Sequence, residues 1–314
     1  MELADAVAQA REVPAQKVAS GYSWTEIPRW HDDTFWFGDM YNHQVLRQGS
    51  DGGFEVVLDV SDRKALGAQP GAGPVDEEVV LGGMGWLPDG RLVVTSMYER
   101  VVLVWDGQSV DLYADLREVA VGPVNDMVVD ADGRAYVTQL GFDMLHGEDA
   151  RNSALLVVEP DGSVRALSEL GELASGNGIT ITADGTRVVV AEVLANCLTV
   201  LDRGPDGALS NRRVFAPTPW LPDGICLDAQ GGVWTAMPGS GVVARFVEGG
   251  EMTDAITLPM EEAMGVACVL GGADRSRLYV CAGMEVFDRD KSRAEGQGSI
   301  WTAKTTYSAG TSRP

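Results

Sequence analysis

VNDMVVDADGRAYVT, residues 124–138, contains the spacing from which the fold is predicted, because three other segments place a polar residue at the same distance before a turn. The oxygen-bearing residue Asn125 stands seven positions before Asp132, and the apolar run between them predicts a strand that ends in a tight turn. The same spacing separates Glu26 from Asp33, Asn177 from Asp184, and Asp223 from Gln230. If these four strands occupy equivalent places in a repeated structure, their first polar side chains lie at equivalent points.

Two further segments have the same spacing but begin with a small residue: Gly82 precedes Asp89 by seven positions, and Ala267 precedes Asp274 likewise. A second strand is predicted after each turn and a third in most units. Six such units of roughly forty to fifty residues predict an all-β fold, a six-bladed β-propeller. The expected blades are approximately 21–60, 81–120, 123–170, 175–217, 221–258 and 264–304.

The beginning of the chain is the exception to this strand pattern. ELADAVAQARE, residues 2–12, is the one stretch that favours a helix, so residues 1–12 are expected to form a helical extension. Residues near 13–20 are expected to add an outer strand to the last blade, which closes the ring and removes an exposed sheet edge. We therefore expect one domain over 1–314. The sixfold phasing disfavours a β-sandwich or a two-domain all-β protein.

In a propeller the innermost strand of each blade begins at one mouth of the central channel. The six equivalent positions would therefore surround that mouth, and two carboxylates and two amide oxygens would meet there. Such a set favours one hard divalent cation, calcium first, with magnesium, manganese, zinc or ferrous iron as alternatives. The candidate metal ligands are Glu26, Asn125, Asn177 and Asp223. Taken singly, Asn125, Asn177 and Asp223 could instead shape the turns in which they stand.

The loops between second and third strands open on the same mouth. They carry the candidate substrate contacts Tyr98, Phe142, His146, Met237 and Met284. Two long insertions, roughly 60–80 and 140–153, could cover this mouth. A mostly apolar, methionine-rich rim suits a hydrophobic ligand. His31, in contrast, falls in the first turn at the far end of its strand, where we expect it to be solvated.

Composition excludes some classes of partner. The chain has 24 Lys and Arg against 46 Asp and Glu, a formal charge of −22, so nucleic acid and anionic membranes are not expected partners. Its 4 cysteines form no CxxC pair, which favours free thiols in a reducing compartment. Without a secretory leader or a long apolar run, the protein is expected to be cytoplasmic. The sequence indicates no oligomeric state.

Five ordered segments resemble the senescence marker protein (regucalcin)/gluconolactonase/luciferin-regenerating enzyme family. They are EIPRW (26–30), VNDMVVDADGRAYVT (124–138), GNGITITADGTRVVVAE (176–192), PDGICLDAQGGVWTA (222–236) and ACVLGGADRSRLYVCAG (267–283). The resemblance implies a six-bladed propeller with one divalent metal in its channel. It implies that Glu26, Asn177 and Asp223 are metal ligands and that Asn125 contacts metal or substrate. Asp223 would also be the general base.

The family resemblance further implies a metal-dependent hydrolase that opens a small-molecule lactone. Regucalcin-like members carry an arginine two residues before the third-blade asparagine, where this chain has Pro123. Together with the apolar rim, this departure favours a fairly apolar lactone over a simple aldonolactone. Two alternatives remain at this point: a phosphotriesterase of the diisopropyl-fluorophosphatase type, and a non-catalytic calcium-binding regulatory propeller.

Overall fold

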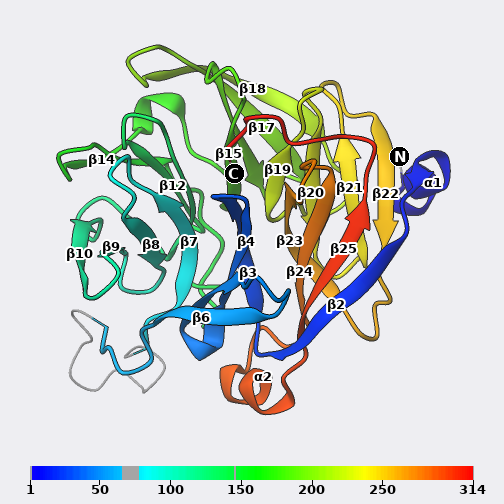
Figure 1. The fold of residues 1–314 in the computed structure, drawn as a ribbon. Coiled ribbons are helices and arrows are strands. Elements are labelled where there is room, and N and C mark those ends of the chain that lie inside the picture. The colour runs from blue at the N-terminus through cyan, green and yellow to red at the C-terminus, as the bar shows by residue number, and fades with distance from the viewer. Residues whose placement is uncertain (1, 66–77, 145, 314) are drawn as a thin grey trace.

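Six β-sheets are arranged around a central axis in the computed structural model, which describes residues 2–65, 78–144 and 146–313 (Figure 1). Each sheet is one blade, and within it consecutive strands pair antiparallel from the axis outward. The predicted six-bladed β-propeller is confirmed. The predicted insertion at 60–80 lies largely outside the described residues, and so does Leu145 within the insertion at 140–153. No helix in the described ranges is long and apolar enough to cross a membrane.

The strands of the first three blades follow one another along the chain. Blade 1 contains β3 (Thr25–His31), β4 (Thr34–Asp39), β5 (Gln44–Gln48) and β6 (Phe54–Asp59). Blade 2 contains β7 (Leu81–Trp86), β8 (Leu92–Ser96), β9 (Val101–Trp105) and β10 (Val110–Asp115). Blade 3 contains β11 (Val124–Val129), β12 (Ala135–Gln139), β13 (Leu156–Val158) and β14 (Val164–Ala166).

The last three blades continue this order. Blade 4 contains β15 (Gly176–Ile181), β16 (Arg187–Glu192), β17 (Cys197–Arg203) and β18 (Leu209–Pro217). Blade 5 contains β19 (Ile225–Leu227), β20 (Val233–Met237), β21 (Val242–Phe246) and β22 (Met252–Thr257). Blade 6 contains β23 (Met264–Gly271), β24 (Arg277–Gly283) and β25 (Gly298–Lys304). Short 3-10 turns η1 (Met40–Asn42) and η3 (Ser168–Leu170) lie between strands.

An N-terminal strand closes the ring. Strand β2 (Ala15–Tyr22) pairs antiparallel with β25 and becomes the outer strand of blade 6, as the sequence predicted. The helix expected over 2–12 is shorter: α1 (Leu3–Gln9) ends before Ala10, which has extended dihedrals. Strand β1 (Arg11–Glu12) then pairs parallel with β22, so these two residues, which were expected to be helical, instead extend the edge of blade 5.

A second helix, α2 (Arg289–Glu295), was not predicted. It lies in the connection between β24 and β25, at the mouth where the innermost strands begin. Asp288 caps it by accepting the Lys291 backbone N–H at 2.9 Å, and Gly296 ends it with a left-handed φ of 57°. Its sequence, RDKSRAE, has no apolar stripe, and without a hydrophobic periodicity the helix could not be predicted from the sequence.

Apolar side chains pack mainly between neighbouring blades. One cluster joins Val93 of β8 to Val137 of β12, and another joins Val157 of β13 to Val190 of β16. Near the axis the backbones themselves meet. A Cβ at Gly83 would lie 2.7 Å from the Met127 N, and one at Gly178 would lie 2.6 Å from the Asp223 O. Glycine at these positions therefore lets adjacent innermost strands come together.

Replacing Gly178 with alanine tests this close approach. The new methyl group would meet backbone atoms of the next blade, including the Ile225 N at 2.7 Å, and backbone cannot yield as a flexible side chain can. We expect Gly178→Ala to lower the free energy of unfolding by about 1–3 kcal/mol in urea denaturation. The control is Gly53→Ala, on an exposed turn where the nearest atom is an Asp51 side-chain oxygen. Equal stability of the two variants would contradict the packing argument.

Candidate metal centre

The innermost strands are irregular where the polar ring residues stand. In five blades the register with the second strand shifts at or beside the predicted ring position. In blade 3 the shift falls between Val124 and Met127, and in blade 4 between Gly176 and Ile179. Such β-bulges turn a side chain out of the regular alternation of a strand. The bulges therefore re-aim residues such as Asn125 and Asn177 relative to their strands.

A small cavity of about 10 Å³ lies where these bulges meet. Five of the six predicted ring positions line it: Glu26, Gly82, Asn125, Asn177 and Ala267. The sixth position, Asp223, is represented by its neighbour Gly224. The volume is comparable to the space that one water molecule occupies. The side chains of Glu26, Asn177 and Asp223 are partly exposed, whereas Asn125 is buried.

Burial and nearby negative charges raise the pKa of both ring carboxylates. Desolvation raises the pKa of Glu26 to about 7, and the charge of Asp126 adds to the rise. Desolvation is the largest cause that raises the pKa of Asp223 well above its ordinary value, and the charges of Glu26 and Asp126 add to the rise. A hydrogen bond from the Asn177 side chain acts in the opposite direction and lowers this pKa. Among the described residues neither Glu26 nor Asp223 forms a salt bridge. The structure thus brings Glu26, Asn177 and Asp223 together.

An arginine–aspartate pair beside the ring was missed by the sequence reasoning. Arg29 Nη2 donates to Asp126 Oδ1 at 2.5 Å, and both side chains are buried. Arg29 also donates to the Met84 and Met127 carbonyls, at 2.9 and 2.8 Å. The signal was present as an arginine inside an apolar strand, because a buried guanidinium needs acceptors. Its partner, 97 positions away, could not be located from one sequence.

Two threonines hold the backbone of the asparagines. Thr95, on β8, donates its hydroxyl to the Asn125 carbonyl at 2.7 Å. Thr138, on β12, donates to the Asn177 carbonyl at 2.8 Å. Both threonines are fully buried. Each bond joins the second strand of one blade to the innermost strand of the next. Because it uses the backbone carbonyl, it does not occupy the side-chain amide of the asparagine, which lines the cavity.

The donor set fits a hard divalent cation. Two carboxylates and two neutral amides offer oxygen ligands around a space of atomic size, and no cationic side chain of the described residues pairs with the carboxylates. The described ranges contain no group of three or more His, Cys, Asp and Glu side chains placed to hold a metal. The candidate centre therefore depends on the amide oxygens of Asn125 and Asn177 as well as on Glu26 and Asp223.

The predicted substrate contacts have different surroundings. Tyr98 is partly exposed and its ring meets that of His146 edge to face, with centroids 6.1 Å apart. His146 is exposed and contacts Asp143 through Nδ1 at 2.6 Å. Met284 is partly exposed just after β24. Phe142 is buried, and Met237 is enclosed in a core cluster with no exposed surface, so Met237 is not accessible to a ligand.

Helix α2 adds a cation to this mouth. The Arg289 guanidinium lies 4.8 Å from the ring centroid of Tyr98 and 5.8 Å from that of Tyr41. Its Nη1 also lies 3.4 Å from a carboxylate oxygen of Glu78. The charges of Tyr98, Arg289 and Glu26 all act on Tyr41, which places these groups near one another. The rim is thus less apolar than the sequence suggested.

Comparisons with known proteins agree with this architecture. The family model described as "SMP-30/Gluconolactonase/LRE-like region" matches residues 24–283. A regucalcin of Xenopus laevis is 26% identical over 294 residues, with 90% of this chain and 91% of that protein covered. Pentonolactonase XacC of Haloferax volcanii is 31% identical over 238 residues, with 72% and 75% covered. A crystal structure of the calcium-binding protein regucalcin from Agrobacterium tumefaciens superposes with a TM-score of 0.71 at 18% identity, covering 96% and 99%.

The raised pKa of Glu26 has a consequence for stability in the presence of a chelator. Between the ordinary value of 4.5 and about 7, the folded protein binds more protons than the unfolded chain. The free energy of unfolding should therefore fall as the pH rises from about 5 to about 7. Glu26→Gln should reduce this slope in urea titrations, and Glu55→Gln, on an exposed strand, should leave it unchanged.

Carboxylates with lowered pKa, such as Asp89 and Asp274, do not obscure this test. They add stability as the pH rises, which is the opposite sign, but they do so below about pH 4. A slope between pH 5 and 7 that Glu26→Gln leaves intact would contradict the assignment.

Proposed function

Because the chain belongs to the SMP-30/gluconolactonase/LRE-like family, we propose that it is a divalent-metal-dependent lactonase. The observation that carries the proposal is an ion-sized cavity lined by Glu26 and Asn177, with Asp223 beside it and hydrogen-bonded to the Asn177 side chain. Two relatives support the reaction class and the metal respectively: one is named a pentonolactonase and another is described as a calcium-binding protein. We propose calcium as the resident ion and the cytoplasm as the location.

Glu26, Asn125, Asn177 and Asp223 would hold a divalent cation, which would supply Lewis acidity to polarise the ester carbonyl and stabilise negative charge on its oxygen. Asp223 accepts a proton from the water whose oxygen attacks the carbonyl carbon. The ring C–O bond then breaks, and Asp223 returns the proton to the leaving alkoxide. The product is an open-chain hydroxy acid.

The finer proposal is that the lactone carries an apolar substituent. Position 123 is a proline whose carbonyl accepts the Leu140 N–H at 2.9 Å, so this point of the mouth offers no side-chain donor for sugar hydroxyls. Tyr98 and Met284 provide partly exposed apolar surface. Arg289, which lies between Tyr41 and Tyr98 and pairs with Glu78, adds positive charge to this mouth, where the product carboxylate forms.

Asp223→Asn tests the general base. The variant keeps an amide oxygen at the ring but cannot accept a proton from water. We expect kcat for lactone hydrolysis to fall about 10²–10⁴-fold, measured with a pH indicator over aliphatic, aromatic and sugar lactones. The matched control is Asp161→Asn, on an exposed turn. Full activity of the Asp223 variant would exclude this role for Asp223.

Asn177→Ala tests the metal ligand set. It removes an amide oxygen from the ring, so calcium affinity and lactone turnover should fall together, in calorimetric titration and in the same lactone assay. Asn211→Ala, at an exposed strand position where the side chain donates to Asp202, is the control. The site assignment is wrong if the Asn177 variant binds calcium as tightly as the unchanged protein.

The same assays separate the competing functions. Turnover of diisopropyl fluorophosphate without lactone turnover would identify a phosphotriesterase, in which case a single turnover in ¹⁸O-labelled water would label Asp223. A calcium-loaded protein that hydrolyses no lactone in the panel would instead be a binding or regulatory propeller.

A further inference from the structure

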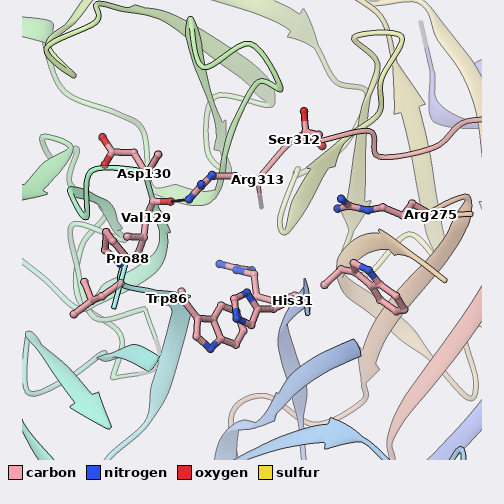
Figure 2. A pocket seen from close by; sticks show the side chains of 14 residues that line it. His31, Trp86, Pro88, Val129, Asp130, Arg275, Ser312 and Arg313 are labelled. Atoms are coloured by element: carbon pink, nitrogen blue, oxygen red, sulfur yellow. Dashed lines mark hydrogen bonds between the residues drawn. The ribbon is translucent and has the colours of Figure 1, made fainter. Parts of the chain in front are cut away.

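A second cavity, of about 360 Å³, lies at the opposite end of the channel, where the innermost strands end (Figure 2). Its walls come from the first turns of several blades and from the C-terminal segment 311–313. Three aromatic side chains line it: Trp30, His31 and Trp86. The sequence predicted a solvated His31, but its ring stacks on Trp86 with centroids 3.8 Å apart and planes 5° apart. This stack forms a flat surface in the cavity wall.

The C-terminal segment is fixed in place across this end of the propeller. It runs from β25 to β15, where the Arg313 and Ile181 backbones exchange hydrogen bonds of 3.2 and 3.0 Å (Figure 1). The Ser312 hydroxyl donates to the Leu227 carbonyl at 3.0 Å, and Arg313 Nη1 donates to the Val129 carbonyl at 3.2 Å. These bonds to blades 3, 4 and 5 hold Arg313 beside the cavity.

Two buried donors in this cavity wall lack acceptors. Within the described residues, three buried side-chain nitrogens or oxygens have no hydrogen-bond partner, and two of them, Trp30 Nε1 and Arg275 Nε, belong to residues that line this cavity. Buried polar groups are nearly always hydrogen-bonded in native proteins. Figure 2 shows the Arg275 side chain reaching into the cavity from blade 6. Both unsatisfied donors belong to the same wall of the cavity.

The cavity also carries positive charge that the protein does not neutralise. Among its charged residues, Arg29 is paired with Asp126, and Asp130 is paired with Arg203 at 2.5 Å. In the part of the chain that the structure describes, Arg275 and Arg313 form no salt bridge. Asp33, whose charge acts on Arg275, and Asp32, which lies 3.4 Å from the His31 ring, stand in an exposed turn. Two unpaired guanidinium groups in one cavity stand out in a chain of net charge −22.

We propose that this far-end cavity binds a small aromatic carboxylate. Its carboxylate accepts hydrogen bonds from Arg275 and the Trp30 N–H and pairs with Arg313, since guanidinium groups suit carboxylates in geometry and charge. Its flat body lies against the His31–Trp86 stack. A volume of about 360 Å³ accommodates a molecule of this size. The site is separate from the proposed lactonase centre, because it lies at the other mouth of the channel.

The test uses benzoate as the probe and benzamide, its neutral counterpart of the same shape, as the ligand control. Both are titrated into the ¹⁵N-labelled Asp223→Asn variant, so that lactone chemistry plays no part. The 8 tryptophan indole N–H signals are followed by NMR, and the Trp30 signal is assigned with Trp30→Phe. We expect benzoate to shift the Trp30 signal in a saturable way and benzamide to leave it unchanged.

Two arginine variants then test the contacts. Arg275→Gln should weaken benzoate binding about 10–100-fold, while lactone turnover in the otherwise unchanged protein stays constant. Arg313→Gln, from the exposed segment, should weaken binding less. Arg277→Gln, an exposed neighbour on β24 outside the cavity, is the matched control and should bind normally.

Several outcomes would overturn the proposal. Benzamide binding as tightly as benzoate would remove the role of charge, and unchanged affinity in Arg275→Gln would remove the role of the open donor. Inorganic phosphate binding more tightly than benzoate would identify a site for inorganic anions instead. None of these outcomes affects the proposed lactonase, whose failure would appear in the Asp223 and Asn177 assays alone.

Discussion

The innermost strands of adjacent blades come so close around the axis that a side chain has no room at Gly83 or Gly178. A methyl group at either position would lie within 2.7 Å of backbone atoms of the next blade. This approach brings together side chains that are distant in sequence, because Asn177 immediately precedes Gly178 and the Asp223 carbonyl is one of the atoms closest to that glycine. The bulges in the same strands then direct the ring residues away from their regular alternation. Close packing and irregular register thus create the candidate centre together.

The buried pair of Arg29 and Asp126 divides the channel. Arg29 lines both the ion-sized cavity and the larger cavity at the far end, so its side chain lies between them. Its hydrogen bonds to two carbonyls and to Asp126 hold the guanidinium in place. One end of the channel consequently presents unpaired carboxylates, while the other presents unpaired guanidinium groups. The two ends of the channel therefore differ in charge, with the matched Arg29–Asp126 pair between them.

The sequence predicted those parts of the molecule that repeat. Glu26, Asn177 and Asp223 were found because the same spacing recurs in four blades, and the blade order followed from six repetitions. Asp126 was missed because its partner, Arg29, stands in another blade, and pairing across blades leaves no periodic signal. Helix α2 was missed because it is short, polar and confined to one blade. Met237 was predicted to contact substrate but lies in the core. Its position at the end of a strand does not by itself show whether the side chain points to the mouth of the channel or into the core.

The composition of the ring limits the charge of its ligand. Glu26 and Asp223 contribute two negative charges when ionised, Asn125 and Asn177 contribute none, and the Arg29–Asp126 pair is neutral as a unit. A divalent cation would balance this set. Without it, burial and the charge of Asp126 raise the pKa of both carboxyls, and the charge of Glu26 adds to the rise at Asp223. Four carboxylates would overcompensate the ion and weaken its Lewis acidity. In the proposed lactonase, a cation held with two amides would still polarise a carbonyl, and Asp223 would still act as a base beside it.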